Sequence, residues 1–146
     1  MAGKLRVLFL CTGNACRSQM AEGWARQLRG EAIEPYSAGI EPAGLDPRAV
    51  AAMAEVGVDI SAHRSKHADE LLGVDFDYVV TVCGHANEHC PQFPRHTKIV
   101  HVGFEDPPSL ARRAAGETEA MGHYRRVRDQ IKAFVETLPR TLTGSS

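Results

Sequence analysis

Cys11-Thr-Gly-Asn-Ala-Cys-Arg17-Ser18 links an apolar strand, predicted over Lys4 to Leu10, to a helical pattern that opens at Ser18. A loop between a strand and a helix directs several backbone N–H groups at one point, and the positive end of the helix adds to their field. That field favours the thiolate form of Cys11, and the planar guanidinium of Arg17 can donate to two oxygens of an anion. The stretch therefore predicts a cysteine nucleophile inside a cradle for a tetrahedral oxyanion.

The residues around this loop support the prediction, because a cysteine six positions before an arginine is by itself a weak signal. Residues 5–10 are almost entirely apolar, which is typical of a buried parallel strand. Gly13 permits a tight turn, and Asn14 tolerates a left-handed backbone. Ser18 is a preferred N-cap residue whose hydroxyl can also hydrogen-bond the sulfur of Cys11. The competing interpretation, an inert buried cysteine followed by a surface arginine, explains none of this context.

Length, composition and charge limit the class of protein. A chain of 146 residues that is 43% hydrophobic can bury a substantial core, and we expect a single domain over residues 1–146. The net charge of −1 argues against a nucleic-acid partner and against binding to a membrane surface. No signal peptide is apparent, so we expect a cytoplasmic monomer. In that reducing compartment the four cysteines are expected to be catalytic, redox-active or metal-binding, and not structural disulfides.

The hydrophobic pattern alternates between strand and helix along the chain. Asp46-Pro47 is typical of a helix start, with aspartate as the N-cap and proline in the first turn. Strands separated by helices predict an α/β fold with a doubly wound four-stranded parallel sheet flanked by helices, whose ligands bind at the carboxyl ends of the strands. The expected strands are Lys4 to Leu10, Ile33 to Ala38, Phe76 to Cys83 and Lys98 to Val102; the expected helices are Ser18 to about Gly30, Pro47 to Val56, Ala68 to Leu72, one turn within Gly84 to His89, and Met121 to Leu138; the tail from Thr141 to Ser146 is expected to fray.

Two further cysteines follow the third expected strand. Cys83 ends that strand, so the parallel sheet can bring it close to Cys11, and Cys90 comes seven residues later. A disulfide between Cys83 and Cys90 would require the intervening helical turn to move or melt. Two alternatives stay open: a pair of thiols without a role, and a metal site that also uses His85 and His89. Because that spacing matches no common zinc pattern, we expect no metal here.

Asp106 follows the fourth expected strand, at the same edge of the sheet as the Cys11 loop. The proline at position 107 keeps Asp106 in an extended conformation. A carboxyl group in that place can protonate an oxygen that leaves a bound oxyanion, which is the role of a general acid. The alternative is a solvated acidic loop, which the Cys11 motif makes less plausible.

Taken together, these motifs resemble the arsenate reductases built on the low-molecular-weight tyrosine phosphatase fold, in their thioredoxin-coupled branch. The resemblance covers nearly the whole chain and is specific, because the anion loop, the cysteine pair and the Asp-Pro occur in the same order. It is carried by Leu10-Cys-Thr-Gly-Asn-Ala-Cys-Arg-Ser-Gln-Met-Ala-Glu-Gly-Trp24, Tyr36-Ser-Ala-Gly-Ile40, Asp59-Ile-Ser61, Val79-Val-Thr-Val-Cys83, Cys90-Pro91 and Gly103-Phe-Glu-Asp-Pro107.

The resemblance implies a role for each of the singled-out residues. It implies a nucleophile at Cys11, a general acid at Asp106 and redox cysteines at Cys83 and Cys90, with arsenate as the substrate. It further implies that thioredoxin reduces a final Cys83–Cys90 disulfide and that no metal or organic cofactor takes part. The implied oxyanion-binding residues are Thr12, Gly13, Asn14, Ala15, Cys16, Arg17 and Ser18; the Ser18 hydroxyl also supports the nucleophile, and Cys16 has a packing role.

One departure from the family pattern concerns a cation site. Potassium-binding members resemble this chain at Asn14, Glu22 and Ser37 but carry an aspartate where Lys66 stands here. An ammonium group in that position would repel a cation or take its place beside Glu22. We therefore do not expect potassium to bind.

Two other functions compete with arsenate reduction. A phosphatase acting through a phosphocysteine at Cys11 would use the same loop, but related phosphatases carry aromatic residues after the Asp-Pro, where this chain has Pro108-Ser-Leu110. Such a phosphatase also has no use for Cys83 and Cys90. A sensor that binds metalloids or zinc through its thiols is the non-enzymatic alternative. The lack of an evident basic DNA-binding helix weakens it.

Overall fold

The computed structural model describes residues 3–144 and contains a parallel sheet in the order β2-β1-β3-β4. The strands are β1 (Leu5–Cys11), β2 (Ile33–Gly39), β3 (Tyr78–Thr81) and β4 (Lys98–His101). Every neighbouring pair is parallel, and the register sets Leu10 level with Ala38 on one side and with Thr81 on the other. The four-stranded parallel α/β sheet expected from the sequence is confirmed.

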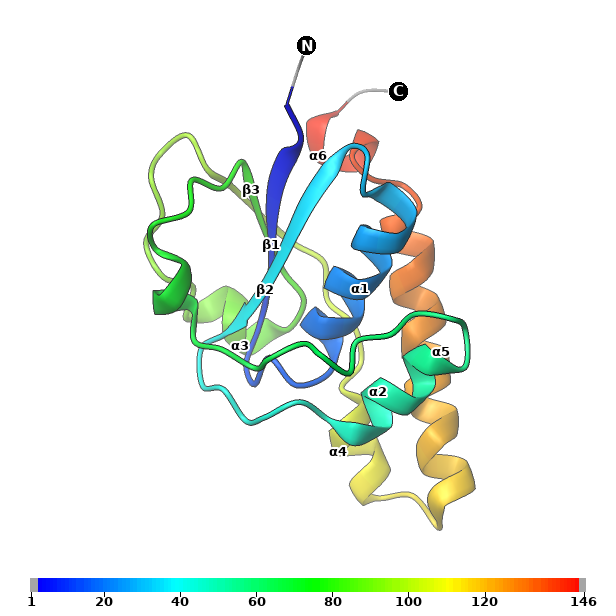
Figure 1. The fold of residues 1–146 in the computed structure, drawn as a ribbon. Helices are drawn as coiled ribbons and strands as arrows, with labels where there is room; N and C mark the ends of the chain where they lie inside the picture. Colours follow the sequence, from blue (N-terminus) through cyan, green and yellow to red (C-terminus); the bar gives the residue numbers. More distant parts are fainter. Residues whose placement is uncertain (1–2, 145–146) are drawn as a thin grey trace.

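β1 lies inside the sheet, and its apolar run explains that position. Residues 7–10 are fully buried although successive side chains point to opposite faces, so both faces of this strand are covered. β4, at the edge, exposes Ile99 and carries charged or polar residues at its ends. Because all four strands are parallel, their carboxyl ends lie at one edge of the sheet, which is the lower edge in Figure 1.

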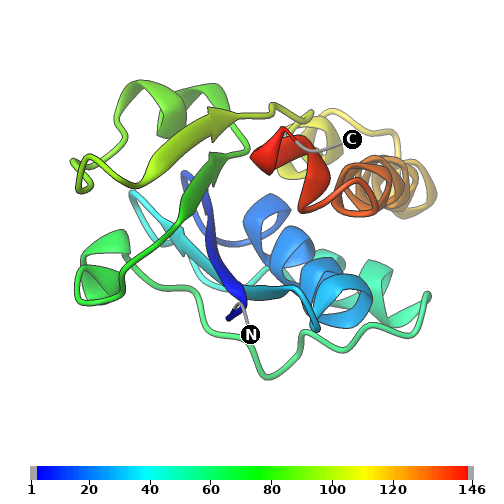
Figure 2. The same cartoon turned by 90° about the horizontal axis from the view of Figure 1, so that it is seen from above.

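Three helices cover one face of the sheet: α1 (Arg17–Arg29), α2 (Pro47–Ala54) and α5 (Glu117–Val135) (Figures 1 and 2). The other side carries the shorter η1 (Ala68–Leu71), a 3₁₀ turn, and α3 (Gly84–Glu88). α4 (Pro107–Arg112) packs against α5, and α6 (Arg140–Thr143) follows α5 at the opposite end from the carboxyl edge. None of the helices in the described part of the chain is long and apolar enough to cross a membrane.

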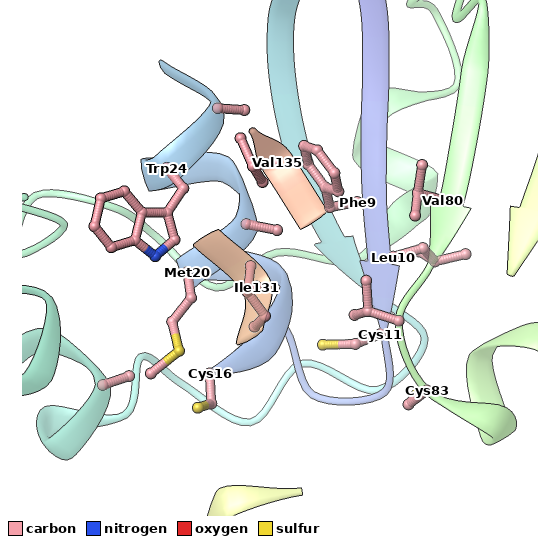
Figure 3. Close-up of a cluster of buried hydrophobic side chains, with 14 of the residues drawn as sticks. Phe9, Leu10, Cys11, Cys16, Met20, Trp24, Val80, Cys83, Ile131 and Val135 are labelled. Carbon is pink, nitrogen blue, oxygen red and sulfur yellow. The ribbon is translucent and has the colours of Figure 1, made fainter. Parts of the chain in front are cut away.

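The core lies between the sheet and α1 and α5 (Figure 3). Phe9 from β1 lies on the side of Met20 and Trp24 from α1, with Ile131 from α5 beside it, whereas Leu10 points to the other face of the sheet. The indole N–H of Trp24 donates to the Arg128 carbonyl at 3.1 Å, which satisfies its one polar atom inside the core. Cys11 and Cys83 lie at the edge of this core, so the chain that carries their sulfurs packs against buried side chains.

The structure corrects several expected boundaries. α1 begins at Arg17 with Cys16 as its N-cap residue, so the prediction of Ser18 as N-cap is wrong; Ser18 is inside the first turn. β3 is shorter than expected, and α5 begins at Glu117, one turn before the expected Met121. α4 was not expected at all. The tail expected to fray forms α6 over residues 140–143, while residues 145–146 of that prediction lie outside the described part.

Candidate active site

The loop between β1 and α1 is held with its carbonyl groups turned outward. The N–H groups of Ile40, Glu41, Ala43 and Asp46 donate to the carbonyls of residues 11, 12, 13 and 15, over distances of 2.8 to 3.2 Å. Because the peptide group is planar and trans, the N–H on the far side of each of these peptides points the opposite way. The N–H groups of residues 12, 13, 14 and 16 are therefore directed into the loop. No side chain caps the start of α1, which leaves the positive end of that helix facing the same space.

A buried chain of hydrogen bonds supports the sulfur of Cys11. The N–H of Lys66 donates to Asn14 Oδ1 at 2.9 Å, which fixes the amide so that Asn14 Nδ2 donates to Ser18 Oγ at 2.8 Å. The Ser18 hydroxyl forms a further hydrogen bond with Cys11 Sγ, 2.9 Å away. The predicted hydrogen bond from Ser18 to Cys11 is thus confirmed. This chain of hydrogen bonds holds the sulfur of Cys11 in place at the anion loop.

The backbone of the loop is strained in one place and crowded in another. Asn14 has φ 48°, so it takes the left-handed conformation that the sequence suggested, and Gly13 does not. Gly39, at the end of β2, approaches the loop so closely that a Cβ there would lie 2.6 Å from the Thr12 carbonyl oxygen and 2.9 Å from the Asn14 nitrogen. Only glycine fits at position 39 without displacing the anion loop.

Arg17 and Asp106 meet on the other side of the loop. Arg17 Nη1 donates to the Phe104 carbonyl at 3.0 Å, and its Nη2 lies 3.5 Å from Asp106 Oδ1. Asp106 begins α4, yet its carboxylate makes no capping hydrogen bond and remains 43% exposed. The guanidinium is thus positioned beside the loop, and a carboxyl group is free to exchange a proton with a ligand there.

These groups line one pocket of about 380 Å³ at the carboxyl edge of the sheet. The pocket combines backbone from the anion loop with side chains from α4 and from the segment after β2. Its lining residues are Cys11, Thr12, Gly13, Ala15, Cys16, Arg17, Ala43, Asp106, Pro108 and Arg112.

Cys83 lies at the margin of the anion loop. β1 and β3 are neighbours with Leu10 level with Thr81, so Cys83 lies one residue beyond the position level with Cys11; Figure 3 shows both residues at this end of the core. Its Sγ is 3.2 Å from the hydroxyl of Thr12, and it also accepts the N–H of Ala86 at 3.4 Å as the N-cap of α3. Both Cys11 and Cys83 are buried.

Cys90 lies beyond α3 and is half-buried, and burial raises the pKa of its thiol. The five residues of α3 lie between Cys83, which is the N-cap residue, and Cys90, and a formed helix holds its two ends apart. A disulfide needs Cα atoms within about 7 Å. Ala86 is the only buried residue of α3, so little packing opposes its unwinding.

Cys16 contributes its backbone N–H to the loop, whereas its thiol is kept out of the chemistry. Burial and the Asp46 carboxylate raise the pKa of its thiol well above the ordinary value, which keeps it protonated. The packing role expected for Cys16 agrees with its place in the core cluster of Figure 3.

Comparison with known proteins places this geometry in a family. Residues 6–145 match the family described as Low molecular weight phosphotyrosine protein phosphatase. The chain belongs to this low-molecular-weight phosphatase family. The family and the fold expected from the sequence are thereby confirmed.

Within the family, the chain is similar to proteins named for arsenate reduction, which confirms the resemblance to arsenate reductases seen in the sequence. An arsenate reductase of Bacillus subtilis (strain 168) is 51% identical over 135 residues, covering 90% of this chain and 95% of the relative. A solved arsenate reductase in the phosphate binding state is 33% identical with a TM-score of 0.70, covering 92% of this chain and 95% of that one. A thioredoxin-dependent arsenate reductase of Corynebacterium glutamicum is 26% identical with a TM-score of 0.71, covering 100% of this chain and 66% of that one.

The structure brings most of the expected site residues of this family member together. Cys11, Arg17 and Asp106 line one pocket, and Cys83 touches its loop, whereas Cys90 lies beyond α3. Sequence reasoning missed Arg112 and the helix that carries it. Asp106-Pro107 repeats the helix-start signature of Asp46-Pro47, and that signal was available.

At the cation site of the family, Lys66 occupies the space beside the expected ligands. Its Nζ donates to the Ser37 carbonyl at 2.9 Å, while the Ser37 hydroxyl donates to Glu22 Oε1 at 2.5 Å. Burial lowers the pKa of the Lys66 ammonium, and the Glu22 carboxylate opposes that shift. A carbonyl and a carboxylate that already receive these donors do not fit a potassium ion.

Potassium is therefore expected to raise the melting temperature no more than sodium does at equal ionic strength. Lys66→Asp removes the competing charge and adds a hard oxygen ligand, so that variant should gain a potassium-specific rise. Thermal unfolding of both proteins in matched chloride series measures the difference. A potassium-specific stabilisation of the unmodified protein would contradict the assignment.

Proposed function

We propose that this chain is a cytoplasmic enzyme that reduces arsenate to arsenite through Cys11 and a disulfide relay, which thioredoxin restores. The observation that carries the proposal is the contact between Cys83 Sγ and the Thr12 hydroxyl, 3.2 Å apart. It puts a second buried thiol at the loop of the first. Phosphate-ester hydrolysis needs one thiol only, whereas reduction of a bound oxyanion needs two.

The first step is the attack of the Cys11 thiolate on the arsenic of arsenate. The inward N–H groups of the loop and the Arg17 guanidinium hold the remaining oxygens. The bond from sulfur to arsenic forms as a bond from arsenic to oxygen breaks, and Asp106 gives a proton to the departing oxygen, which leaves as water. The half-exposed, uncapped carboxyl of Asp106 suits this proton transfer.

The second step moves two electrons to arsenic. The thiolate of Cys83 attacks the sulfur of Cys11, and the electron pair of the sulfur–arsenic bond stays with arsenic. Arsenic passes from the +5 to the +3 state and leaves as arsenite, and a Cys11–Cys83 disulfide remains. The hydrogen bonds of Cys83 Sγ to the Ala86 N–H and to the Thr12 hydroxyl hold the attacking sulfur at the loop of Cys11.

The third step carries the oxidation outward. The Cys90 thiolate attacks the sulfur of Cys83 and expels the Cys11 thiolate, which leaves a Cys83–Cys90 disulfide. Since burial raises the pKa of Cys90 and α3 keeps it apart from Cys83, the step requires α3 to unwind. The unwound segment offers its disulfide to the dithiol of thioredoxin, and the similarity to a thioredoxin-dependent relative supports this donor.

Turnover of arsenate in the presence of thioredoxin, thioredoxin reductase and NADPH tests the proposal. We expect arsenate-dependent oxidation of NADPH with release of arsenite, and only poor rates when glutathione and glutaredoxin replace thioredoxin. Hydrolysis of p-nitrophenyl phosphate, followed in parallel, should be weak. Efficient ester hydrolysis without arsenate-dependent NADPH oxidation would assign a phosphatase instead. Equal rates with both donors would assign a different reductant.

A further inference from the structure

One face of α4 forms part of the wall of the active-site pocket. Pro108 and Arg112 are four residues apart, so they lie on the same side of the helix, and both line the pocket with Asp106. The next residue, Arg113, ends the helix and does not line the pocket. The pocket therefore has a second guanidinium, from an element far along the chain from the anion loop.

The guanidinium of Arg112 has no partner within the described part of the chain. In the described residues 3–144 its exposed side chain makes no hydrogen bond or ion pair, unlike Arg17, which is tied to Asp106. Arg126, on the neighbouring α5, is paired with Glu105. A long cationic side chain at the mouth of a pocket, without a partner, is available to an anion.

The charged groups that line the pocket indicate a role for Arg112 in binding anions. The Arg17 guanidinium already faces the Asp106 carboxyl, 3.5 Å away, and donates to the Phe104 carbonyl, so it is not free to neutralise a dianion by itself. Arsenate near neutral pH carries more than one negative charge, so its entry is opposed unless further positive charge is present. Arg112 is the other cationic side chain that lines the pocket.

We propose that Arg112 is a second oxyanion-recognition residue, which draws the free dianion into the pocket and binds an oxygen directed away from Cys11. This assignment rests on the proposed function. In a phosphate or arsenate ester that outward oxygen bears an organic group, which would lie against Pro108 and Arg112. Arg112 therefore favours small free oxyanions over esters and acts in specificity.

Alkylation of Cys11 tests the charge directly, without arsenate turnover. Iodoacetate is an anion and iodoacetamide is neutral, so the ratio of their rates at Cys11, followed by peptide mass spectrometry, reports the field in the pocket. We expect Arg112→Gln to lower the iodoacetate rate about threefold and Arg112→Glu about tenfold, with the iodoacetamide rate unchanged. Inorganic phosphate should protect Cys11 less well in both variants, by similar factors.

Arg113→Gln is the matched control, because it removes the same charge from the adjacent position outside the pocket. It should leave the ratio of alkylation rates and the phosphate protection near those of the unmodified chain. Equal losses in the Arg112 and Arg113 variants would show a general surface charge and overturn the proposal. Unchanged values in Arg112→Gln would also overturn it.

Steady-state kinetics separate this inference from the proposed function. In the thioredoxin assay, Arg112→Gln should raise the KM for arsenate about threefold and leave kcat nearly unchanged, because the residue acts in binding. If the unmodified chain does not reduce arsenate, the proposed function fails, while the alkylation and phosphate measurements still decide the role of Arg112.

Discussion

Replacement of Cys11 by serine is expected to abolish arsenate reduction and any hydrolysis of phosphate esters, a loss of at least about a thousandfold. A hydroxyl is far less ionised than a thiol at neutral pH, so serine at this position is not a comparable nucleophile. The measurement is NADPH oxidation in the thioredoxin assay and release of p-nitrophenol in the ester assay. Retention of either activity would disprove the role of Cys11.

Phosphate binding provides the control for this variant. The inward N–H groups of the loop and the Arg17 guanidinium are unaffected by Cys11→Ser, and Ser18 can donate to the new hydroxyl. Calorimetry should therefore show phosphate binding by the inactive variant. Loss of binding together with activity would mean that the loop itself had changed, and a second variant, Cys11→Ala, would then separate the two effects.

The sheet and the anion loop could be predicted from the sequence because their signals are local. The apolar run of residues 5–10, the turn residues after Cys11 and the apolar periodicity of α1 each specify one element, and the elements agree with one another. The parallel topology then requires Cys11, Cys83 and Asp106 to lie at one edge, and the structure has them there.

The start of α1 could not be predicted from residue preferences, for a reason linked to its role. Ser18 has the side chain of a preferred N-cap, yet it lies in the first turn and turns its hydroxyl to Cys11. No side chain takes the first N–H groups of the helix. A capping serine would use one of the donors that an oxyanion site needs, so the local rule is broken where the site is built.

Other features depend on tertiary contacts that no local pattern contains. The orientation of the Asn14 amide is fixed by the backbone N–H of Lys66, 52 residues away in the sequence. The contact between Thr12 and Cys83 requires the register of β1 and β3. Arg112 lines the pocket only because α4 begins at Pro107, directly after Asp106, and packs against α5.

The relay is expected to stop at different points in two cysteine variants. Cys83→Ser should release no arsenite by the intramolecular route, because no second thiol reaches the Cys11 adduct. Cys90→Ser should release one arsenite per chain and then stop, with Cys11–Cys83 as its disulfide. Serine at position 83 is also a good N-cap for α3, so the first variant is expected to keep the local structure.

Ester hydrolysis is the control for both variants. Cys11, Arg17 and Asp106 remain in place, so the rate with p-nitrophenyl phosphate should stay within about twofold of the unmodified chain, as expected for changes outside the groups that act on the ester. Peptide mass spectrometry after one turnover identifies the disulfide in each protein. A Cys11–Cys16 bond as the only product would exclude the relay, since Cys16 would then be the resolving thiol.

Sustained turnover of Cys90→Ser would also contradict the relay, and burial explains why we do not expect it. Cys11 and Cys83 are 3% and 6% exposed, so a disulfide between them lies beyond the reach of a protein dithiol. Thioredoxin can reduce a disulfide only if one of its two sulfurs is accessible to the thiolate on the thioredoxin surface. Only transfer to Cys90, with unwinding of the weakly packed α3, brings the oxidised sulfur to the surface. Cys90 is thus required for every turnover after the first, and a small-molecule dithiol should restore part of the activity that thioredoxin cannot.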